Sequence, residues 1–235
     1  PKMYLGSNIS KYKMPGTNDE YWAMGSEHYV KNSVKNVEDF LAPFNKKLKT
    51  KAPTILPSNY TPELDCSPVL DDQWTSHYQQ YIGVLRWAVE LGRIDICGEV
   101  SMMAAFNANP RIGHFEAIMH MFAYLKYKER SRVVFDSSLP EVPEVIPADW
   151  YQFYGDTKEE LPPDMPEPLG KPVRQVTFAD SDHAGDQVNR RSRTGVLMYV
   201  NRSPITWYSK KQLSCETSTF GSEMVAMKTA VEMSL

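Results

Sequence analysis

A proline-rich acidic segment separates two parts of this sequence that differ in character. Residues 137–172 hold eight of the 17 prolines and carry a net charge of −6, within a chain whose net charge is −3. Proline supplies no backbone donor and restricts the residue before it, so no long helix or central strand can cross this segment. We expect an acidic, partly extended linker with local order around Trp150, Tyr151, Phe153 and Tyr154, and flanking parts that are mildly basic. An acidic mimic of nucleic acid is the functional alternative for this segment.

The bulk composition is that of an ordinary globular protein. The chain has 235 residues, enough for one large or two small domains, and 42% of them are hydrophobic. The cysteines Cys66, Cys97 and Cys215 are odd in number and form no CxxC pair. They therefore indicate neither a disulfide framework nor a zinc site, and a reducing compartment is the simpler interpretation. No apolar run is long enough for a membrane span, and the first residues do not resemble a signal peptide.

The part before the linker has the pattern of a hairpin followed by helices. Turn residues at 15–19 predict a hairpin between strands at 3–9 and 20–24. Apolar positions then recur at helical spacing in several stretches, which follow a proline-bearing connector at 43–73. The predicted helices cover residues 27–41, 74–91, 95–107 and 112–128, and a short strand is expected at 132–136.

The part after the linker changes to a period of two, which indicates strands. We expect strands at 176–180, 194–200 and 205–209, joined by short connections into an antiparallel meander. A helix capped by Ser218 or Thr219 then runs through Met233. Its apolar stripe is formed by Met224, Met227 and Val231, with Glu223 on the edge of that stripe.

Two carboxylates in this second part are candidates for metal chemistry. Asp180 ends the first strand, and Glu223 lies at the start of the helix. Hydrolysis of a phosphodiester needs an activated water and neutralised oxygens, which a pair of Mg²⁺ ions bound by converging carboxylates can supply. The alternative is that both carboxylates have only a structural role. An aspartate at a strand end commonly closes a turn, and a glutamate in a first helical turn favours the helix dipole.

The segment 176–233 resembles the ribonuclease H domain of copia-type (Pseudoviridae) retrotransposon Pol polyproteins. Four ordered blocks carry the resemblance, and they are residues 179–186, 190–195, 203–212 and 218–226. This sequence has His183 where the family commonly has tryptophan, and Gly221 where the family has alanine or a similar helix former. Neither departure affects Asp180 or Glu223.

The resemblance continues more weakly upstream. Short matches to the palm strand, thumb and connection of a reverse transcriptase occur at residues 4–9, 78–87, 93–96, 109–110, 114–117 and 124–126. The resemblance implies an α/β (α+β) protein with a helical thumb and connection, followed by an incomplete ribonuclease H-like fold of three antiparallel strands and a helix. The implied domains are residues 1–136 for palm strand, thumb and connection, 137–172 for the linker, and 173–235 for the truncated ribonuclease H-like domain.

The resemblance also implies a site and its partners. Asp180 and Glu223 would be the first two catalytic carboxylates, both as Mg²⁺ ligands of a two-metal site. An RNA–DNA hybrid or template-primer would be the substrate, and the remainder of the Pol polyprotein would be a partner. The location by family is intracellular, in cytoplasmic virus-like particles and the nucleus. Asp182 fits a turn role better than an outer-shell role. The residues expected to contact phosphates are Lys210, Lys211, Arg190, Arg191 and Arg193.

The candidate site is expected to be incomplete in this sequence. The family's third and fourth carboxylates would follow the last residue, and the polymerase aspartates would precede the first. The sequence therefore looks like a fragment of a longer protein that copies RNA into DNA and cleaves RNA in hybrids, and activity of these 235 residues alone is not expected. The alternative is a catalytically inert remnant that at most binds nucleic acid.

Overall fold

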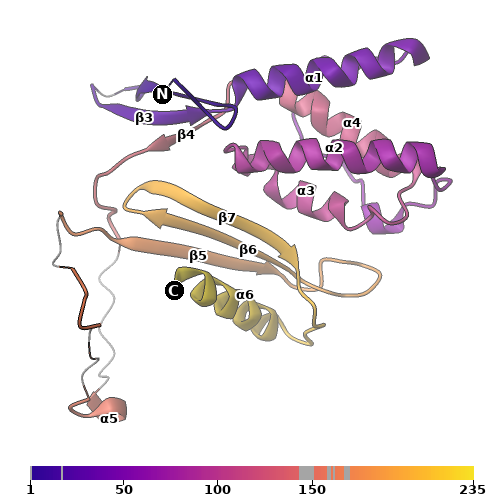
Figure 1. Ribbon diagram of the computed structural model, residues 1–235. Coiled ribbons are helices and arrows are strands. Elements are labelled where there is room, and N and C mark those ends of the chain that lie inside the picture. Colours follow the sequence, from indigo (N-terminus) through magenta and orange to yellow (C-terminus); the bar gives the residue numbers. More distant parts are fainter. Residues whose placement is uncertain (1, 17, 143–150, 158–159, 161, 167–169) are drawn as a thin grey trace.

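The computed structural model describes residues 2–16, 18–142, 151–157, 160, 162–166 and 170–235. It is an α+β structure with two antiparallel sheets and a bundle of helices (Figure 1). The mixed fold class predicted from the sequence is confirmed at this level. We call residues 27–128 the helical unit and residues 173–235 the sheet unit.

The first sheet joins the amino-terminal strands to a strand far along the chain. Its order is β1-β2-β3-β4, and the strands are β1 (Met3–Tyr4), β2 (Ser7–Lys13), β3 (Glu20–Gly25) and β4 (Arg132–Phe135). The single strand predicted at 3–9 was wrong. Leu5 and Gly6 both have positive φ values, 49° and 96°, and turn the chain between β1 and β2. The predicted strand at 132–136 is confirmed. It pairs with β3 and forms the last strand of the sheet.

The helical unit contains the main hydrophobic core of the molecule. Its helices are α1 (Glu27–Leu41), α2 (Asp72–Glu90), α3 (Cys97–Ala104) and α4 (Ile112–Tyr127), close to the predicted ranges. Asp71 caps α2 by accepting a hydrogen bond of 2.8 Å from the Trp74 backbone N–H. Side chains from all four helices meet in one buried cluster that includes Val37, Leu85, Val100 and Phe122. Apolar periodicity in the sequence therefore produced the helices and their packing faces.

An ion pair between the buried Arg93 side chain and the part-exposed Asp95 carboxylate stabilises the turn between α2 and α3. The Arg93 side chain is fully buried, and its Nε and Nη2 donate to the two Asp95 oxygens at 2.9 and 2.7 Å. The Tyr124 hydroxyl donates to the same carboxylate at 2.9 Å. Burial by itself raises the Asp95 pKa, but the hydrogen bonds and charge of Arg93 outweigh it and hold that pKa below its usual value.

The sheet unit is a three-stranded meander with one helix on one face. Its elements are β5 (Gln175–Asp182), β6 (Arg193–Val200), β7 (Ser203–Lys211) and α6 (Thr219–Ser234), in the sheet order β5-β6-β7. The predicted meander is confirmed, although β7 begins before Pro204 rather than after it. Pro204 lies in a strand that forms the edge of this sheet, beside a shift in the β6–β7 register.

The packing face of α6 differs from its apolar stripe. Small residues face the sheet: Ser222 and Ala226 are fully buried, and Ala230 contacts Val196 and Met198. The stripe identified from the sequence, Met224, Met227 and Val231, is exposed instead. Small side chains let the helix backbone approach the strands closely, so they occupy the interface although the larger residues are more apolar.

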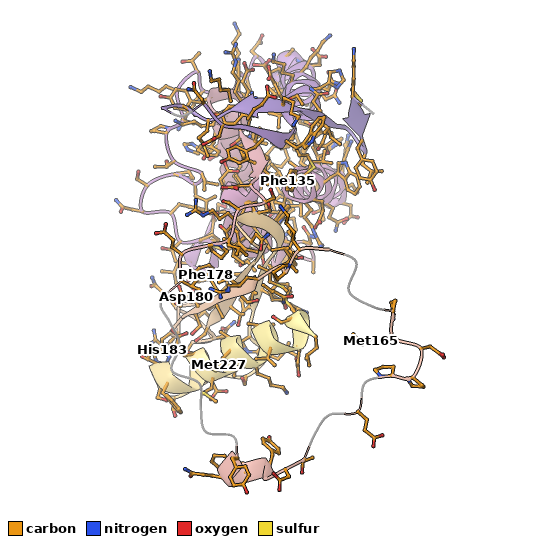
Figure 2. The ribbon with its side chains drawn as sticks, turned by 90° about the vertical axis from the view of Figure 1, so that its left-hand side faces the viewer. Phe135, Met165, Phe178, Asp180, His183 and Met227 are labelled. Carbon is orange, nitrogen blue, oxygen red and sulfur yellow. The ribbon has the colours of Figure 1, made fainter. Side chains whose placement is uncertain are left out.

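The described linker residues 151–157 lie outside both units (Figure 1). Among the described residues of the linker is the short helix α5 (Tyr151–Tyr154), which Figure 1 shows well away from the body of the molecule, as Figure 2 does for Met165. Local order around the aromatic residues 151–154 is thus confirmed. Trp150 and the other linker residues at 143–149, 158–159, 161 and 167–169 lie outside the described part of the chain.

The second sheet lies between α6 on one side and the helical unit on the other (Figure 1). β7 contacts α3 and β4, and the Trp207 indole N–H donates to the Val89 carbonyl at 3.0 Å. The two units therefore share an interface built on β7. In the part of the chain that the structure describes, no helix is long and apolar enough to cross a membrane.

Candidate functional site

Asp180 lies near the end of β5, on the sheet face opposite α6. Thr177 on β5 contacts the α6 residue Ser234, with 3.0 Å between their hydroxyl oxygens, so odd-numbered positions of the strand face that helix. Strand alternation then directs Asp180 to the same side as Phe178, whose ring packs edge-on against Tyr199 at 5.9 Å between centroids. Asp180 is exposed (Figure 2), and β5 is an edge strand of its sheet in the part of the chain that the structure describes.

Glu223 lies in the first turns of α6, at the same end of the sheet. Ser218 caps this helix by accepting from the Gly221 N–H at 3.1 Å. The buried Gln212 side chain then ties the helix to the middle strand, since its amide donates to the Ser222 carbonyl at 2.9 Å and to the Thr194 hydroxyl at 3.1 Å. Thr194 pairs with the residue that follows Asp180 on β5. Glu223 is thus held one residue from this anchor, and it is half-buried.

The two carboxylates do not form a metal site by themselves. Carboxylate oxygens are suitable Mg²⁺ ligands, but Asp180 belongs to β5 and Glu223 to α6, a helix that covers the face of the sheet opposite Asp180. Among the described residues, no three histidine, cysteine, aspartate or glutamate side chains converge on one point. A resident Mg²⁺ pair needs several oxygens directed at one spot. The arrangement in this chain therefore does not fit such a pair without further ligands.

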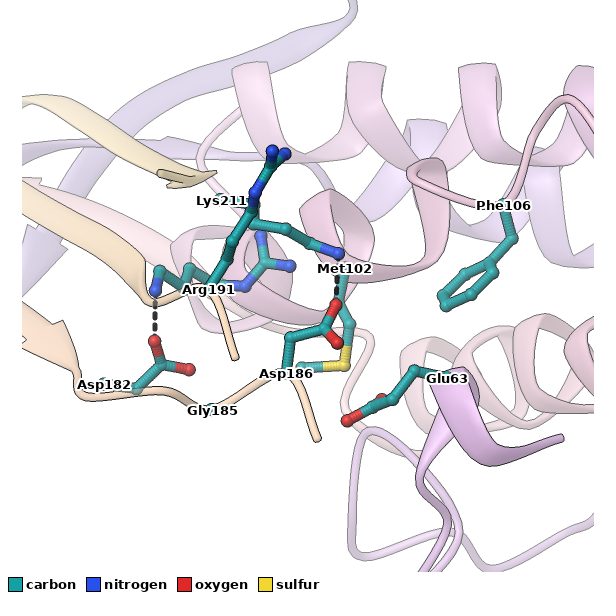
Figure 3. A pocket seen from close by; sticks show the side chains of 9 residues that line it. Glu63, Met102, Phe106, Asp182, Gly185, Asp186, Arg191 and Lys211 are labelled. Carbon is teal, nitrogen blue, oxygen red and sulfur yellow. Dashed lines mark hydrogen bonds and ion pairs between the residues drawn. The ribbon is translucent and has the colours of Figure 1, made fainter. Parts of the chain in front are cut away.

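Asp182 and Asp186 organise the loop that follows β5 (Figure 3). Asp182 accepts a hydrogen bond from the Arg193 backbone N–H across the loop, which is the turn role predicted for it. Burial raises the Asp182 pKa, and the neighbouring Asp180 adds to that effect. Asp186 accepts from the backbone N–H groups of Val188 and Asn189 at 3.0 and 2.9 Å. These contacts make the loop a fixed structure.

The residues predicted to contact phosphates fall into two groups. Lys211 is ion-paired with Asp186, and Arg193 is partly buried and donates to the Ser101 hydroxyl on α3 at 2.8 Å. Burial lowers the Arg193 pKa. The structure thus gives these two cations partners inside the molecule. Arg190, Arg191 and Lys210 are exposed, and no ion pair is recorded for them among the described residues.

The loop after β5 also forms part of the interface between the two units, which the sequence did not indicate. The Glu63 carboxylate, from the connector before α2, accepts from the Gln187 backbone N–H at 3.0 Å. A small cavity of about 40 Å³ lies here, lined by Glu63, Asp186 and Lys211 among others (Figure 3). No local pattern could have found this contact, because its two sides are 124 residues apart.

Comparisons with known proteins connect the chain to a retrotransposon polyprotein and to an effector. The secreted RxLR effector protein 161 of Plasmopara viticola is 23% identical over 155 residues, which are 66% of this chain and 87% of that protein. The retrovirus-related Pol polyprotein from transposon TNT 1-94 of Nicotiana tabacum is 27% identical over 149 residues, which are 63% of this chain and 9% of that protein. No family model and no solved structure matches the chain.

The chain is therefore similar to a part of a retrotransposon Pol polyprotein. It spans under a tenth of that protein's length but most of the effector's length. The four sequence blocks predicted a resemblance to a retrotransposon Pol polyprotein, and this similarity agrees with that prediction. It does not distinguish the individual domains of the polyprotein.

Proposed function

We propose that this chain is a reverse transcriptase and ribonuclease H segment of a copia-type Pol protein, and that it binds the phosphate backbone of an RNA–DNA hybrid. The observation that carries the proposal is the exposed set Arg190, Arg191 and Lys210. The β5–β6–β7 register places Lys210 in line with Thr194 and Ser181, at the same end of the sheet as Asp180. The Pol similarity supplies the class of ligand.

Binding of this kind is electrostatic and independent of base sequence. Lysine and arginine side chains neutralise phosphates and release counterions, so affinity falls steeply as salt is added. Arg190 and Arg191 lie in a loop that Asp182 and Asp186 hold in place, which lowers the entropic cost of presenting their charges. The whole chain has a net charge of −3, so the contact must depend on this local surface rather than on bulk charge.

The cleavage chemistry is a further part of the proposal and depends on ligands beyond these residues. Asp180 and Glu223 would contribute carboxylates to Mg²⁺-dependent hydrolysis of the RNA strand once additional oxygen ligands are brought to the free edge of β5. In the chain of 235 residues alone, we expect binding of the hybrid without turnover. Domain assignments follow the same proposal: palm strand, thumb and connection at 1–136, the linker at 137–172, and the first part of a ribonuclease H-like domain at 173–235.

The binding test compares two triple variants of equal charge. Arg190→Gln/Arg191→Gln/Lys210→Gln removes the proposed phosphate contacts, and Lys2→Gln/Lys13→Gln/Lys171→Gln removes three exposed lysines elsewhere. Fluorescence anisotropy with a labelled RNA–DNA hybrid should show a salt slope that is smaller by roughly 2 to 3 for the first variant only. Equal slopes for both variants would contradict the proposal.

The cleavage test uses the same hybrid with Mg²⁺. The chain is expected to leave the RNA strand intact, and a longer protein that includes the downstream sequence is expected to cut it. Asp180→Asn in that longer protein should abolish the cut and preserve binding. Cleavage that survives Asp180→Asn would remove Asp180 from the chemistry.

A second candidate function follows from the effector similarity. The match covers 87% of a protein named as a secreted effector. Sequence related to this chain therefore makes up most of that effector. This favours a non-catalytic binding module. The two candidates differ in the longer protein, because a module of that kind would show no cleavage under any Mg²⁺ concentration.

A further inference from the structure

A hollow at one end of the helical unit has an apolar lining that is open to solvent. Its volume is about 360 Å³, and it lies where the end of α1 meets the first turns of α2 and α4. Phe44, Val69 and Ile112 line it, and all three are exposed. A groove of about 620 Å³ adjoins the hollow and shares Leu41 and Phe115 with it. An exposed apolar surface of this kind is typical of a site that another molecule covers.

The groove and the hollow differ in charge. Three lysines, Lys46, Lys47 and Lys49, line the groove together with one acid, Glu116. Lys46 and Glu116 also reach the hollow, where Asp71 adds a second acid. The lining therefore sums to +2 in the groove, from three lysines and one acid, and to −1 in the hollow, from one lysine and two acids. A ligand that matches both must place negative charge in the groove and uncharged, apolar groups in the hollow.

The lysines of the groove are presented from a fixed position. Leu48 is 6% exposed and Ala52 is fully buried, and both belong to the main hydrophobic cluster. Lys46, Lys47 and Lys49 are exposed beside these anchors, and no ion pair is recorded for them among the described residues. A segment held in this way loses less conformational entropy on binding than a free lysine tail. The groove is thus prepared for a negatively charged partner.

The linker of this chain carries side chains that complement both surfaces. Helix α5 exposes three aromatic side chains, with 67% of Tyr151, 75% of Phe153 and 61% of Tyr154 open to solvent. Exposed acids follow in the described part of the linker: Asp156, Glu160 and Asp164. Aromatic groups followed by acids repeat the order of hollow and groove. Tyrosine also combines an apolar ring with a hydroxyl donor, which suits a hollow that is apolar but holds two carboxylates.

We propose that the hollow and groove of one copy bind α5 and the acids after it from a second copy of this chain. The aromatic side chains of α5 enter the hollow, where the tyrosine hydroxyls donate to Glu116 or Asp71. The acids that follow pair with Lys46, Lys47 and Lys49. Opposite charges in this order steer the encounter and set its orientation, while the buried aromatic rings supply most of the affinity.

A second copy fits this role better than the chain's own linker. Figure 1 shows α5 well away from the helical unit, so the segment lies clear of the hollow of its own chain. Two copies that exchange it reciprocally make two identical contacts, as in a two-fold dimer. Each contact alone is small, and the first raises the effective concentration for the second. Asp180, Glu223 and Arg190 take no part, so this association and hybrid binding stand or fall separately.

The first test measures anisotropy of a fluorescein-labelled peptide of residues 151–166, which holds four acids and one lysine for a net charge of −3. Lys46→Gln/Lys47→Gln/Lys49→Gln in the chain is expected to weaken binding about ten-fold and to make it less sensitive to salt. Phe44→Ala, at an exposed position, is expected to weaken binding about ten-fold with unchanged salt sensitivity. The control Lys2→Gln/Lys13→Gln/Lys35→Gln removes three exposed lysines elsewhere and should bind as the parent chain does.

The second test is sedimentation of the whole chain. The mass of the parent should rise toward that of a dimer as its concentration is raised. The Lys46/Lys47/Lys49 variant and the linker variant Tyr151→Ser/Phe153→Ser/Tyr154→Ser should each remain monomeric. An equal mixture of the two variants should regain a heavier species, because one supplies an intact linker and the other an intact hollow and groove.

Three results would overturn the proposal. The first is equal peptide binding by the groove variant and the control variant, which would exclude the groove. The second is a parent chain that stays monomeric although the peptide binds, which would assign the segment to the hollow of its own chain. The third is a mixture of variants no heavier than its components, which would exclude exchange of the linker between copies.

Discussion

The helical unit and the sheet unit are built on very different cores. In the helical unit, side chains from α1–α4 form one large cluster, and residues such as Leu85, Ile118 and Phe122 have no measurable exposure. The buried apolar cluster of the sheet unit consists of Val196, Met198 and Ala230. Hydrophobic stabilisation scales with the apolar area removed from water, so the helical unit must supply most of the stability. The sheet unit depends on its contact with the helical unit through β7.

The largest expected effect is therefore in the helical core. Phe122→Ala should cost about 3–5 kcal/mol, because Phe122 is fully buried and its ring packs edge-on against Tyr81 at 5.6 Å. Val196→Ala, a smaller truncation in the sheet unit, should cost about 1–2 kcal/mol. Urea unfolding of the two variants measures both values. Equal losses would show that the two cores contribute alike.

The ion pair between Arg93 and Asp95 gives the next effect. Asp95→Asn leaves the Arg93 guanidinium buried without its counter-charge and should cost about 3 kcal/mol near pH 7. The Asp95 pKa is lowered in the folded state, so its contribution is complete above the unfolded pKa and disappears as pH falls through the folded pKa. Urea midpoints of parent and variant should therefore converge in acid, below about pH 4. A difference that stays constant across this range would exclude the ion pair as the cause.

A smaller effect is expected at the junction of the units. Trp207→Phe keeps an aromatic ring but removes the N–H that donates to the Val89 carbonyl, at a cost of about 1 kcal/mol. Because this bond joins the two units, amide exchange should quicken in β6 and β7 while α4 stays protected. Uniform exchange changes throughout the chain would mean that the units unfold together and that the comparison of two cores is too simple.

The sequence predicted those elements whose signals are local. The helices at 27–41 and 112–128 were placed correctly, because their apolar periodicity and their packing faces coincide. Asp182 was expected in a turn role because turn chemistry acts within a few residues. The pairing of β3 with β4 and the bond from Trp207 to Val89 join residues over 100 positions apart, and no local pattern contains them.

The candidate site was predictable only in part for the same reason. Strand and helix positions for Asp180 and Glu223 followed from periodicity, and both lie at one end of the sheet. Whether the Asp180 and Glu223 side chains reach the same face of the sheet depends on how α6 packs against β5. Local sequence patterns do not determine that packing. Likewise, no sequence pattern indicated that Lys211 and Arg193 have partners inside the molecule. In the structure, Lys211 is ion-paired with Asp186, and Arg193 donates to the Ser101 hydroxyl.

The smallest expected effect tests the inverted face of α6. Met227 is 55% exposed, whereas the adjacent Ala226 is fully buried. The larger apolar side chain therefore faces solvent, and the smaller one faces the sheet. Met227→Gln should change the free energy of unfolding by no more than about 0.5 kcal/mol, as expected for a surface position. Ala226→Leu should cost about 1–3 kcal/mol, because the added atoms must push the helix off the strands. Urea unfolding of these two variants decides which face packs. If Met227→Gln proved the more damaging, the apolar stripe would be the packed face and α6 would be rotated relative to β5.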